Sequence, residues 1–96
     1  MTKITPTNIY RHELIGLHAE VVDSKNKYLV GIKGLVIDET KNMLVILDKD
    51  GKSKIIPKSV CTFRFTLPDG TLVDVLGSLI VGRPEDRLKK VIRRRW

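Results

Sequence analysis

The sequence predicts a mainly β protein, a small antiparallel barrel of Sm-like or SH3-like type with a short helix at each end. Three observations favour this class. The middle of the chain contains five or six short apolar segments, alternating or rich in β-branched residues, with turn residues between them at intervals typical of small barrels. Within these segments Gly31, Gly34 and Gly77 fit a strongly bent sheet that closes on itself and hides its edges. Both ends of the chain instead show helical spacing of apolar residues.

The chain of 96 residues is long enough for one hydrophobic core, so we expect a single domain. Residues 1–16 are predicted to form a helix, because Pro6 and Thr7 suit a first helical turn and Gly16 suits a stop. The barrel is expected over residues 17–82. Its strands are predicted at residues 17–24, 31–39, 43–47, 52–56, 61–67 and 71–81.

The C-terminal part, residues 83–96, is predicted to be a basic helix in which Pro84 occupies the first turn. It holds seven of the 18 basic residues and two acidic ones, so it carries +5 of the chain's net +7. Leu88, Val91 and Ile92 form an apolar stripe that can pack on the barrel. The helix dipole stabilises one or two cations near the helix end, at about 0.3–1 kcal/mol each. The surplus of charge therefore favours a surface that meets a polyanion.

The sequence offers no arrangement of residues suited to catalysis or metal binding. His12 and His18 are expected on different elements, with no activated nucleophile near them. Cys61 is the only cysteine and is predicted to be a small core residue. Asp48 and Asp50 resemble the opening of a calcium loop, but the downstream glutamate of such a loop is missing, so a turn is expected. We therefore expect no catalytic residue, no metal and no cofactor bound by this chain.

No apolar run approaches the roughly 20 residues that span a bilayer, and the first residues lack the apolar stretch of a signal peptide. Together with the absence of a disulfide framework, this predicts a soluble cytoplasmic protein that does not contact a membrane. Taken by itself, the net charge of +7 suits contact with nucleic acid or an anionic membrane surface.

Basic side chains on the barrel and on the C-terminal helix are the candidates for RNA contact. The alternative for the barrel residues is the ordinary polar outer face of a half-solvated sheet. Only 5% of the residues are aromatic, so contacts with the RNA backbone and its shape are expected rather than base stacking on exposed rings. The candidates are Lys33, Lys54, Lys58, Arg64, Arg83, Arg87, Lys90, Arg93 and Arg94.

The predicted N-terminal helix has apolar residues on more than one side. One side can pack on the barrel while another contacts a partner protein, or all of them can pack on the domain itself. The candidates for the partner contact are Ile9, Tyr10, Leu14 and Ile15.

Several sequence blocks, in order, carry a family resemblance. They are HELIGL, GLVIDETKNMLVI, IPK followed by the strand with Phe63 and Phe65, and GSLIVGRPEDRLKK. Over about residues 8–90 the chain resembles the archaeal ribonuclease P protein component 1 family, the archaeal relatives of the eukaryotic Pop4 subunit. The last residues, including Arg93 and Arg94, lie outside these blocks, so their expected RNA contact rests on charge alone.

The resemblance implies a specific function. Members of this family have an Sm-like barrel with terminal helices and are non-catalytic protein subunits of a ribozyme that removes the 5′ leader from precursor tRNA. The RNA carries out the chemistry with bound magnesium ions, and the protein pairs with a zinc-ribbon protein subunit, which the N-terminal helix is expected to contact. Two alternatives are another RNA-binding module, of Sm-type or ribosomal SH3-like kind, and a protein-interaction adaptor whose basic tail is incidental.

Overall fold

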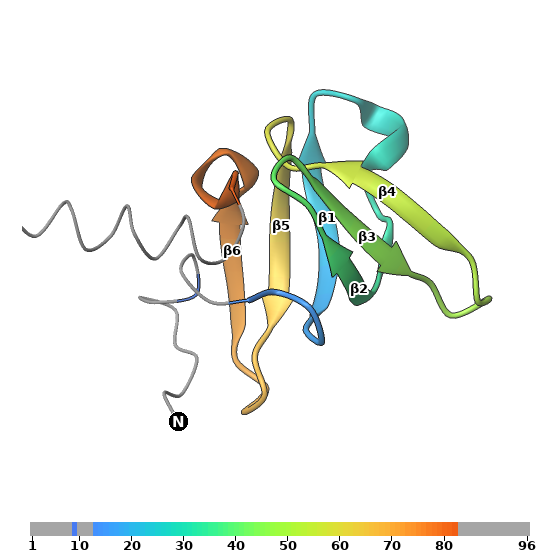
Figure 1. Ribbon diagram of the computed structural model, residues 1–96, viewed down its shortest axis with the longest axis vertical. Helices are drawn as coiled ribbons and strands as arrows, with labels where there is room; N and C mark the ends of the chain where they lie inside the picture. The colour runs from blue at the N-terminus through green and yellow to red at the C-terminus, as the bar shows by residue number, and fades with distance from the viewer. Residues whose placement is uncertain (1–8, 10–12, 83–96) are drawn as a thin grey trace, which may run out of the picture.

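The computed structural model describes residue 9 and residues 13–82, which form one strongly bent antiparallel sheet (Figure 1). The strands follow the order β4-β3-β2-β1-β5-β6 across the sheet. Their bounds are β1 His18–Ser24, β2 Lys33–Glu39, β3 Met43–Leu47, β4 Ser53–Pro57, β5 Cys61–Thr66 and β6 Leu72–Leu76. Two short 3-10 helices, η2 (Lys27–Leu29) and η3 (Gly77–Ile80), follow β1 and β6.

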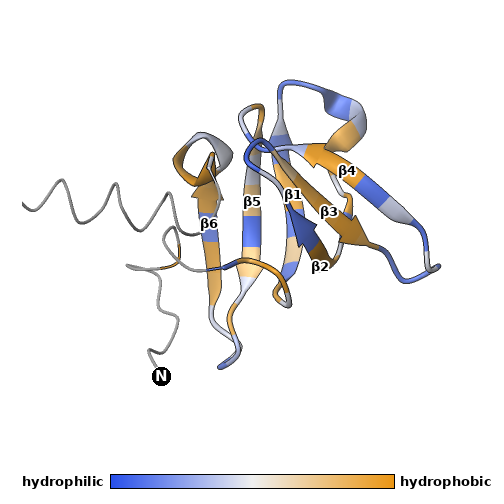
Figure 2. Cartoon of the chain, in the orientation of Figure 1, coloured by the Kyte–Doolittle hydropathy of each residue, from blue (hydrophilic) through white to orange (hydrophobic). Residues whose placement is uncertain are grey.

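Alternation of side chains explains how the sheet builds its core. In β5 the side chains of Cys61, Phe63 and Phe65 are buried, while the intervening residues lie on the other face. The two phenylalanine rings pack with their centroids 5.9 Å apart. Figure 2 shows the same change between apolar and polar residues along β1 and β5, whereas β3 is apolar along its whole length. The mainly β class is therefore confirmed.

Strand β2 changes its partner along its length, and this bends the sheet. Lys33 and Gly34 pair with β1, the residues from Val36 onward pair with β3, and Leu35 pairs with His18 on one side and Leu47 on the other. A Cβ at Gly34 would lie 2.0 Å from the carbonyl oxygen of Leu47. A glycine is therefore required where the two strands cross so closely.

Gly77 permits a second close approach, which ends the last strand. A Cβ on Gly77 would lie 1.6 Å from the carbonyl oxygen of Lys58 and 2.7 Å from that of Cys61. The chain turns here into η3 and packs against the turn between β4 and β5. The predicted strand over 71–81 is thus shorter, because Gly77 begins a helical turn rather than sitting inside the strand.

Two expectations about the architecture need correction. The barrel is not closed, because β4 and β6 are the two edges of the sheet and do not pair within the described residues; they lie on opposite sides of the molecule in Figure 1. Residues 13–16, the last part of the helix predicted over residues 1–16, are described and are not helical. Leu17 N–H donates to the Leu14 carbonyl in a turn, and Gly16 has φ +96°. The helix predicted over residues 83–96 lies outside the described residues.

Candidate nucleic-acid interface

A row of alternating charges crosses the outer face of the sheet. Neighbouring positions on β2, β1, β5 and β6 place Lys33 beside Glu20, Glu20 beside Arg64 and Arg64 beside Asp74. Arg64 and Asp74 form a two-point ion pair, with Nε–Oδ1 2.7 Å and Nη2–Oδ2 3.1 Å. This hydrogen bonding raises the pKa of Arg64 and lowers that of Asp74. Both side chains are close to half exposed, so the pair organises the surface more than it stabilises the fold.

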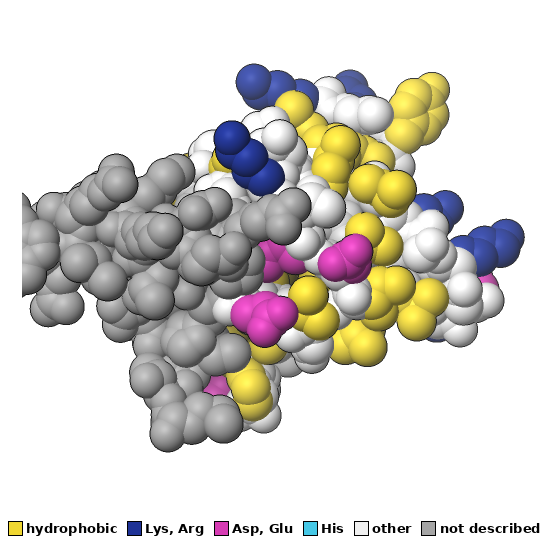
Figure 3. Space-filling model, in the orientation of Figure 1, with side chains coloured by type: hydrophobic (Ala, Val, Ile, Leu, Met, Phe, Trp, Pro, Cys, Tyr) yellow, Lys and Arg dark blue, Asp and Glu magenta, His cyan; other side chains and the backbone are white. Residues whose placement is uncertain are grey.

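Lys33 and Lys54 are exposed, and both line one cleft. The cleft has a volume of about 530 Å³ and lies between the start of β2 and the turn that joins β3 to β4. Lys49, from that turn, also lines it. On the face shown in Figure 3, hydrophobic side chains gather over β3 and β4, and Lys or Arg side chains stand beyond them at the end of the β3–β4 hairpin.

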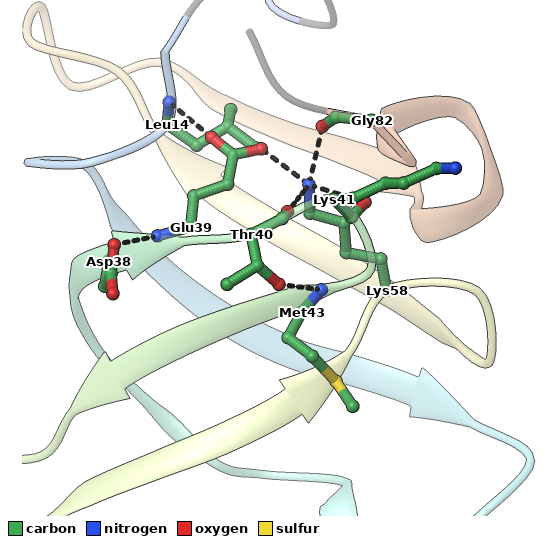
Figure 4. A network of polar contacts seen from close by, with 8 residues as sticks. All are labelled: Leu14, Asp38, Glu39, Thr40, Lys41, Met43, Lys58 and Gly82. Atoms are coloured by element: carbon green, nitrogen blue, oxygen red, sulfur yellow. Dashed lines mark hydrogen bonds and ion pairs between the residues drawn. The ribbon is translucent and has the colours of Figure 1, made fainter.

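Lys58 does not lie on this surface. Its side chain is fully buried, and its Nζ donates to Glu39 Oε2 at 2.6 Å, to the carbonyls of Thr40 and Gly82 at 2.8 and 3.0 Å, and to the Lys41 carbonyl at 3.3 Å (Figure 4). An ammonium enclosed by four oxygens cannot reach a phosphate without breaking this cluster. The expectation that Lys58 contacts RNA is therefore corrected, and Lys58 is assigned to the interior.

The buried Lys58–Glu39 pair joins segments that are far apart in the sequence. Leu14 N–H donates to Glu39 Oε1 at 3.4 Å, and Gly82 N–H donates to the Lys41 carbonyl at 2.7 Å. The segment before β1 and the segment after η3 therefore meet at the turn between β2 and β3, as Figure 4 shows. A buried charge pair with this many hydrogen bonds fixes where the segments enter and leave the sheet.

The residues predicted to contact a partner protein separate into different environments. Ile9 and Leu14 are 1% and 0% exposed and belong to the hydrophobic core, so their side chains are not available to a partner. Ile15 is 40% exposed and stays a candidate. Tyr10 lies outside the described residues, as do the RNA-contact candidates Arg83, Arg87, Lys90, Arg93 and Arg94.

The remaining candidates have structural roles. Asp48 Oδ1 accepts from the backbone N–H groups of Asp50 and Lys52, which is the expected turn. Cys61 is buried; desolvation raises the pKa of its thiol, while a hydrogen bond to Ser24 acts in the opposite direction. No group of three or more His, Cys, Asp or Glu side chains within residue 9 and residues 13–82 is placed to hold a metal ion. Nor does this part of the chain contain a helix long and apolar enough to cross a membrane.

Sequence reasoning missed two features, one in the interior and one on the surface. Glu39 was not identified as the partner of Lys58, because nothing in IPK or DETKN marks either charge as buried. Lys49 was not included among the barrel candidates, although its place in the DKDG turn beside Lys52 and Lys54 was a usable signal.

Comparison with known proteins identifies the family. The model of the ribonuclease P/MRP subunit p29 family matches residues 7–90, most of the chain. The chain belongs to this family. A relative from Methanocaldococcus jannaschii, named ribonuclease P protein component 1, is 57% identical over 90 residues, 94% of each chain. A relative of the same name from Pyrococcus furiosus is 50% identical over 96 residues, covering 98% of this chain and 70% of the relative.

A solved structure of the p29 family also resembles this fold. The structure of Mth11, described as a homologue of the human RNase P protein Rpp29, aligns with a TM-score of 0.59 and 43% identity. The alignment covers 79% of this chain and 97% of Mth11. The p29 family is thus supported both by sequence and by structure.

Proposed function

We propose that this chain is a non-catalytic protein subunit of archaeal ribonuclease P that binds and organises the catalytic RNA for removal of the 5′ leader from precursor tRNA. The observation that carries the proposal is the family match over residues 7–90, together with relatives named ribonuclease P protein component 1 at 46–57% identity. On this assignment the chain takes part in tRNA processing. It is also the archaeal counterpart of the eukaryotic Pop4 subunit.

The surface chemistry supports a role in RNA binding rather than in catalysis. Lys33 and Lys54 stand exposed on the sheet, and five of the chain's seven net positive charges come from residues 83–96. Such side chains neutralise phosphates and release counterions, which lets RNA strands approach each other and the protein. The chemistry of cleavage is then supplied by the RNA and its magnesium ions, which this chain helps to position.

The proposal also includes a contact with another protein. The partner is the zinc-ribbon subunit of the same complex, and the contact includes Ile15 and the segment that contains Tyr10. Because Ile9 and Leu14 are buried in the core, their role is to hold this segment on the sheet. A partner contact made through the same segment would then depend on an intact core.

The test is cleavage of precursor tRNA by a reconstituted ribonuclease P at limiting magnesium. The reaction is run with the chain present, omitted, or cut after Lys90. Omission is expected to reduce the rate or the substrate affinity, and the truncation shows whether the last residues contribute. If omitting the chain changes neither the rate nor the substrate affinity, the proposed function is wrong, and binding to ribosomal or Sm-type RNA should be examined instead.

The salt dependence of RNA binding tests the surface directly. Each lost phosphate contact lowers the slope of log affinity against log salt by about 0.7–0.9. Lys33→Ala and Lys54→Ala are expected to lower the slope in this way. Lys27→Ala, which removes an exposed lysine of η2 outside the cleft, is the matched control and is expected to change it less. If the slope of log affinity against log salt were the same for all three variants, Lys33 and Lys54 would not be part of the RNA interface.

A further inference from the structure

The cleft beside Lys33 and Lys54 is produced by the course of β2. Before Leu35, β2 pairs with β1, while β3 runs past Leu47 into its turn toward β4. The two strands touch where Gly34 meets the Leu47 carbonyl and separate beyond that crossing, and the space beside it is lined by Ile32, Leu35 and Leu47. Its volume of about 530 Å³ lies within the range of about 300–1,000 Å³ that is usual for small-ligand sites.

The rim of the cleft carries more positive than negative side chains. Lys33, Lys49 and Lys54 line it from three different segments, and His18 lies at the β1 side. Asp48 and the exposed Asp50 also line it, and Asp48 Oδ1 accepts from two backbone N–H groups of the turn, so the three lysines exceed the two carboxylates by one charge. The cleft therefore combines an apolar floor with cations at several points of its edge.

We propose that this cleft binds the base of an unpaired, unstacked nucleotide of RNA, with the neighbouring phosphates held by Lys33, Lys49 and Lys54. The inference rests on the proposed function and deepens it, because it names how the barrel recognises RNA. A nucleobase has flat apolar faces and is carried on an anionic backbone, which matches an apolar floor with a rim of net positive charge. Proteins commonly hold a base that has left its stack between apolar or aromatic side chains.

A double-stranded RNA is a poorer fit to the same site. Its bases are stacked inside the helix, so only phosphates and sugars reach a protein surface of this kind. Contact with phosphates alone would use the lysines and leave Ile32, Leu35 and Leu47 exposed. The scarcity of aromatic residues does not exclude base recognition here, because the apolar side chains of the cleft replace an exposed ring.

The test compares three probes bound to the full-length chain: a short single-stranded oligouridylate, the same strand with abasic riboses, and an RNA duplex. Removing the bases is expected to weaken binding at least about fivefold, the lower end of what base stacking contributes. The salt slope should stay the same, because the phosphates are unchanged. In methyl NMR spectra, the signals of Ile32, Leu35 and Leu47 should shift with the base-bearing strand and not with the abasic strand or the duplex.

A matched pair of variants tests the cleft itself. Leu35 and Leu72 are both exposed leucines on strands, at 45% and 62%, but only Leu35 lines this cleft. Leu35→Ser is expected to weaken binding of the base-bearing strand and leave the abasic strand unaffected. Leu72→Ser should change neither. The probe comparison uses the unaltered protein, so it holds even if a variant folds poorly.

Each outcome separates this inference from the proposed function. If the base-bearing and abasic strands bind equally and the three methyl signals stay in place, the base-binding cleft is refuted, while a role in ribonuclease P stands if omission still impairs cleavage. If the methyl signals move on adding a protein subunit and not RNA, the cleft is a protein contact and the inference is refuted. If no RNA binds and omission has no effect on cleavage, both fail.

Discussion

Replacing Lys58 by methionine should destabilise the protein strongly, although a methionine fits a buried site. The side chain is fully buried, and the change removes the positive charge that faces the Glu39 carboxylate at 2.6 Å. It also removes a donor to the carbonyls of Thr40, Lys41 and Gly82. Removing one partner of a buried ion pair costs about 3–5 kcal/mol. For a domain of this size that is a large part of a total of about 5–15 kcal/mol.

The assays are urea unfolding and thermal unfolding, both followed by far-UV circular dichroism, with the urea slope m checked for two-state behaviour. Since 1 kcal/mol shifts the melting temperature of a small domain by about 4–8 °C, a fall of more than about 10 °C is expected. Lys27→Met, an exposed control, should stay within about 0.5 kcal/mol of the unaltered protein.

A double variant tests whether the cost comes from the pair. Lys58→Met combined with Glu39→Gln should be less destabilised than the sum of the two single changes, because the carboxylate no longer carries an uncompensated charge. Strict additivity would refute the argument. A loss below about 1 kcal/mol for Lys58→Met alone would also refute it, and would return Lys58 to the candidates for RNA contact.

Three further predictions use the same unfolding assay or a simple chemical probe. Gly77→Ala should cost at least about 1–3 kcal/mol, because its Cβ would meet the backbone carbonyl of Lys58 rather than a flexible side chain; a midpoint equal to that of the unaltered protein would contradict this. The pKa of Asp74 is lowered by Arg64, so the pair stabilises the fold above the ordinary aspartate pKa and loses this effect as the pH falls through the lowered value. Asp74→Asn should therefore be slightly less stable at neutral pH and equal to the unaltered protein in acid, with a smaller difference at high salt. Burial raises the pKa of the Cys61 thiol, so native protein should react with iodoacetamide much more slowly than unfolded protein at the same pH, and equal rates would contradict its burial.

The strands were largely predictable because their signals are local. Alternation in CTFRFTL placed Cys61, Phe63 and Phe65 on the buried face, and the structure buries all three. The DKDG and PDG turns follow from residues that favour turns, and hydrogen bonds close both of them. Close backbone approach was one of the roles predicted for Gly34, and interruption of the last apolar run was predicted for Gly77. The structure shows the close approach at Gly34 and the end of β6 before Gly77.

What the sequence could not indicate depends on contacts between distant segments. Closure of a barrel requires the two edge strands to meet, and no local pattern in β4 or β6 specifies whether they do. The burial of Lys58 depends on two other segments converging on its ammonium, the end of β2 with its following turn, through Glu39 and Lys41, and the segment after η3, through Gly82. In isolation the same lysine has the features of an ordinary solvent-exposed residue after a strand.

The two predicted RNA-binding regions start from opposite ends of β2. The cleft lies at the Lys33 end, whereas Gly82, from which the basic residues 83–96 continue, is held at the other end beside Lys41. Seven residues at about 3.3 Å each separate these ends by roughly 20 Å. Sites more than about 7–10 Å apart without shared partners contribute additively. The losses in log affinity from Lys33→Ala and from truncation after Gly82 should therefore add for an RNA long enough to reach both ends, and a truncation that abolishes the effect of Lys33→Ala would mean that the two regions bind as one surface.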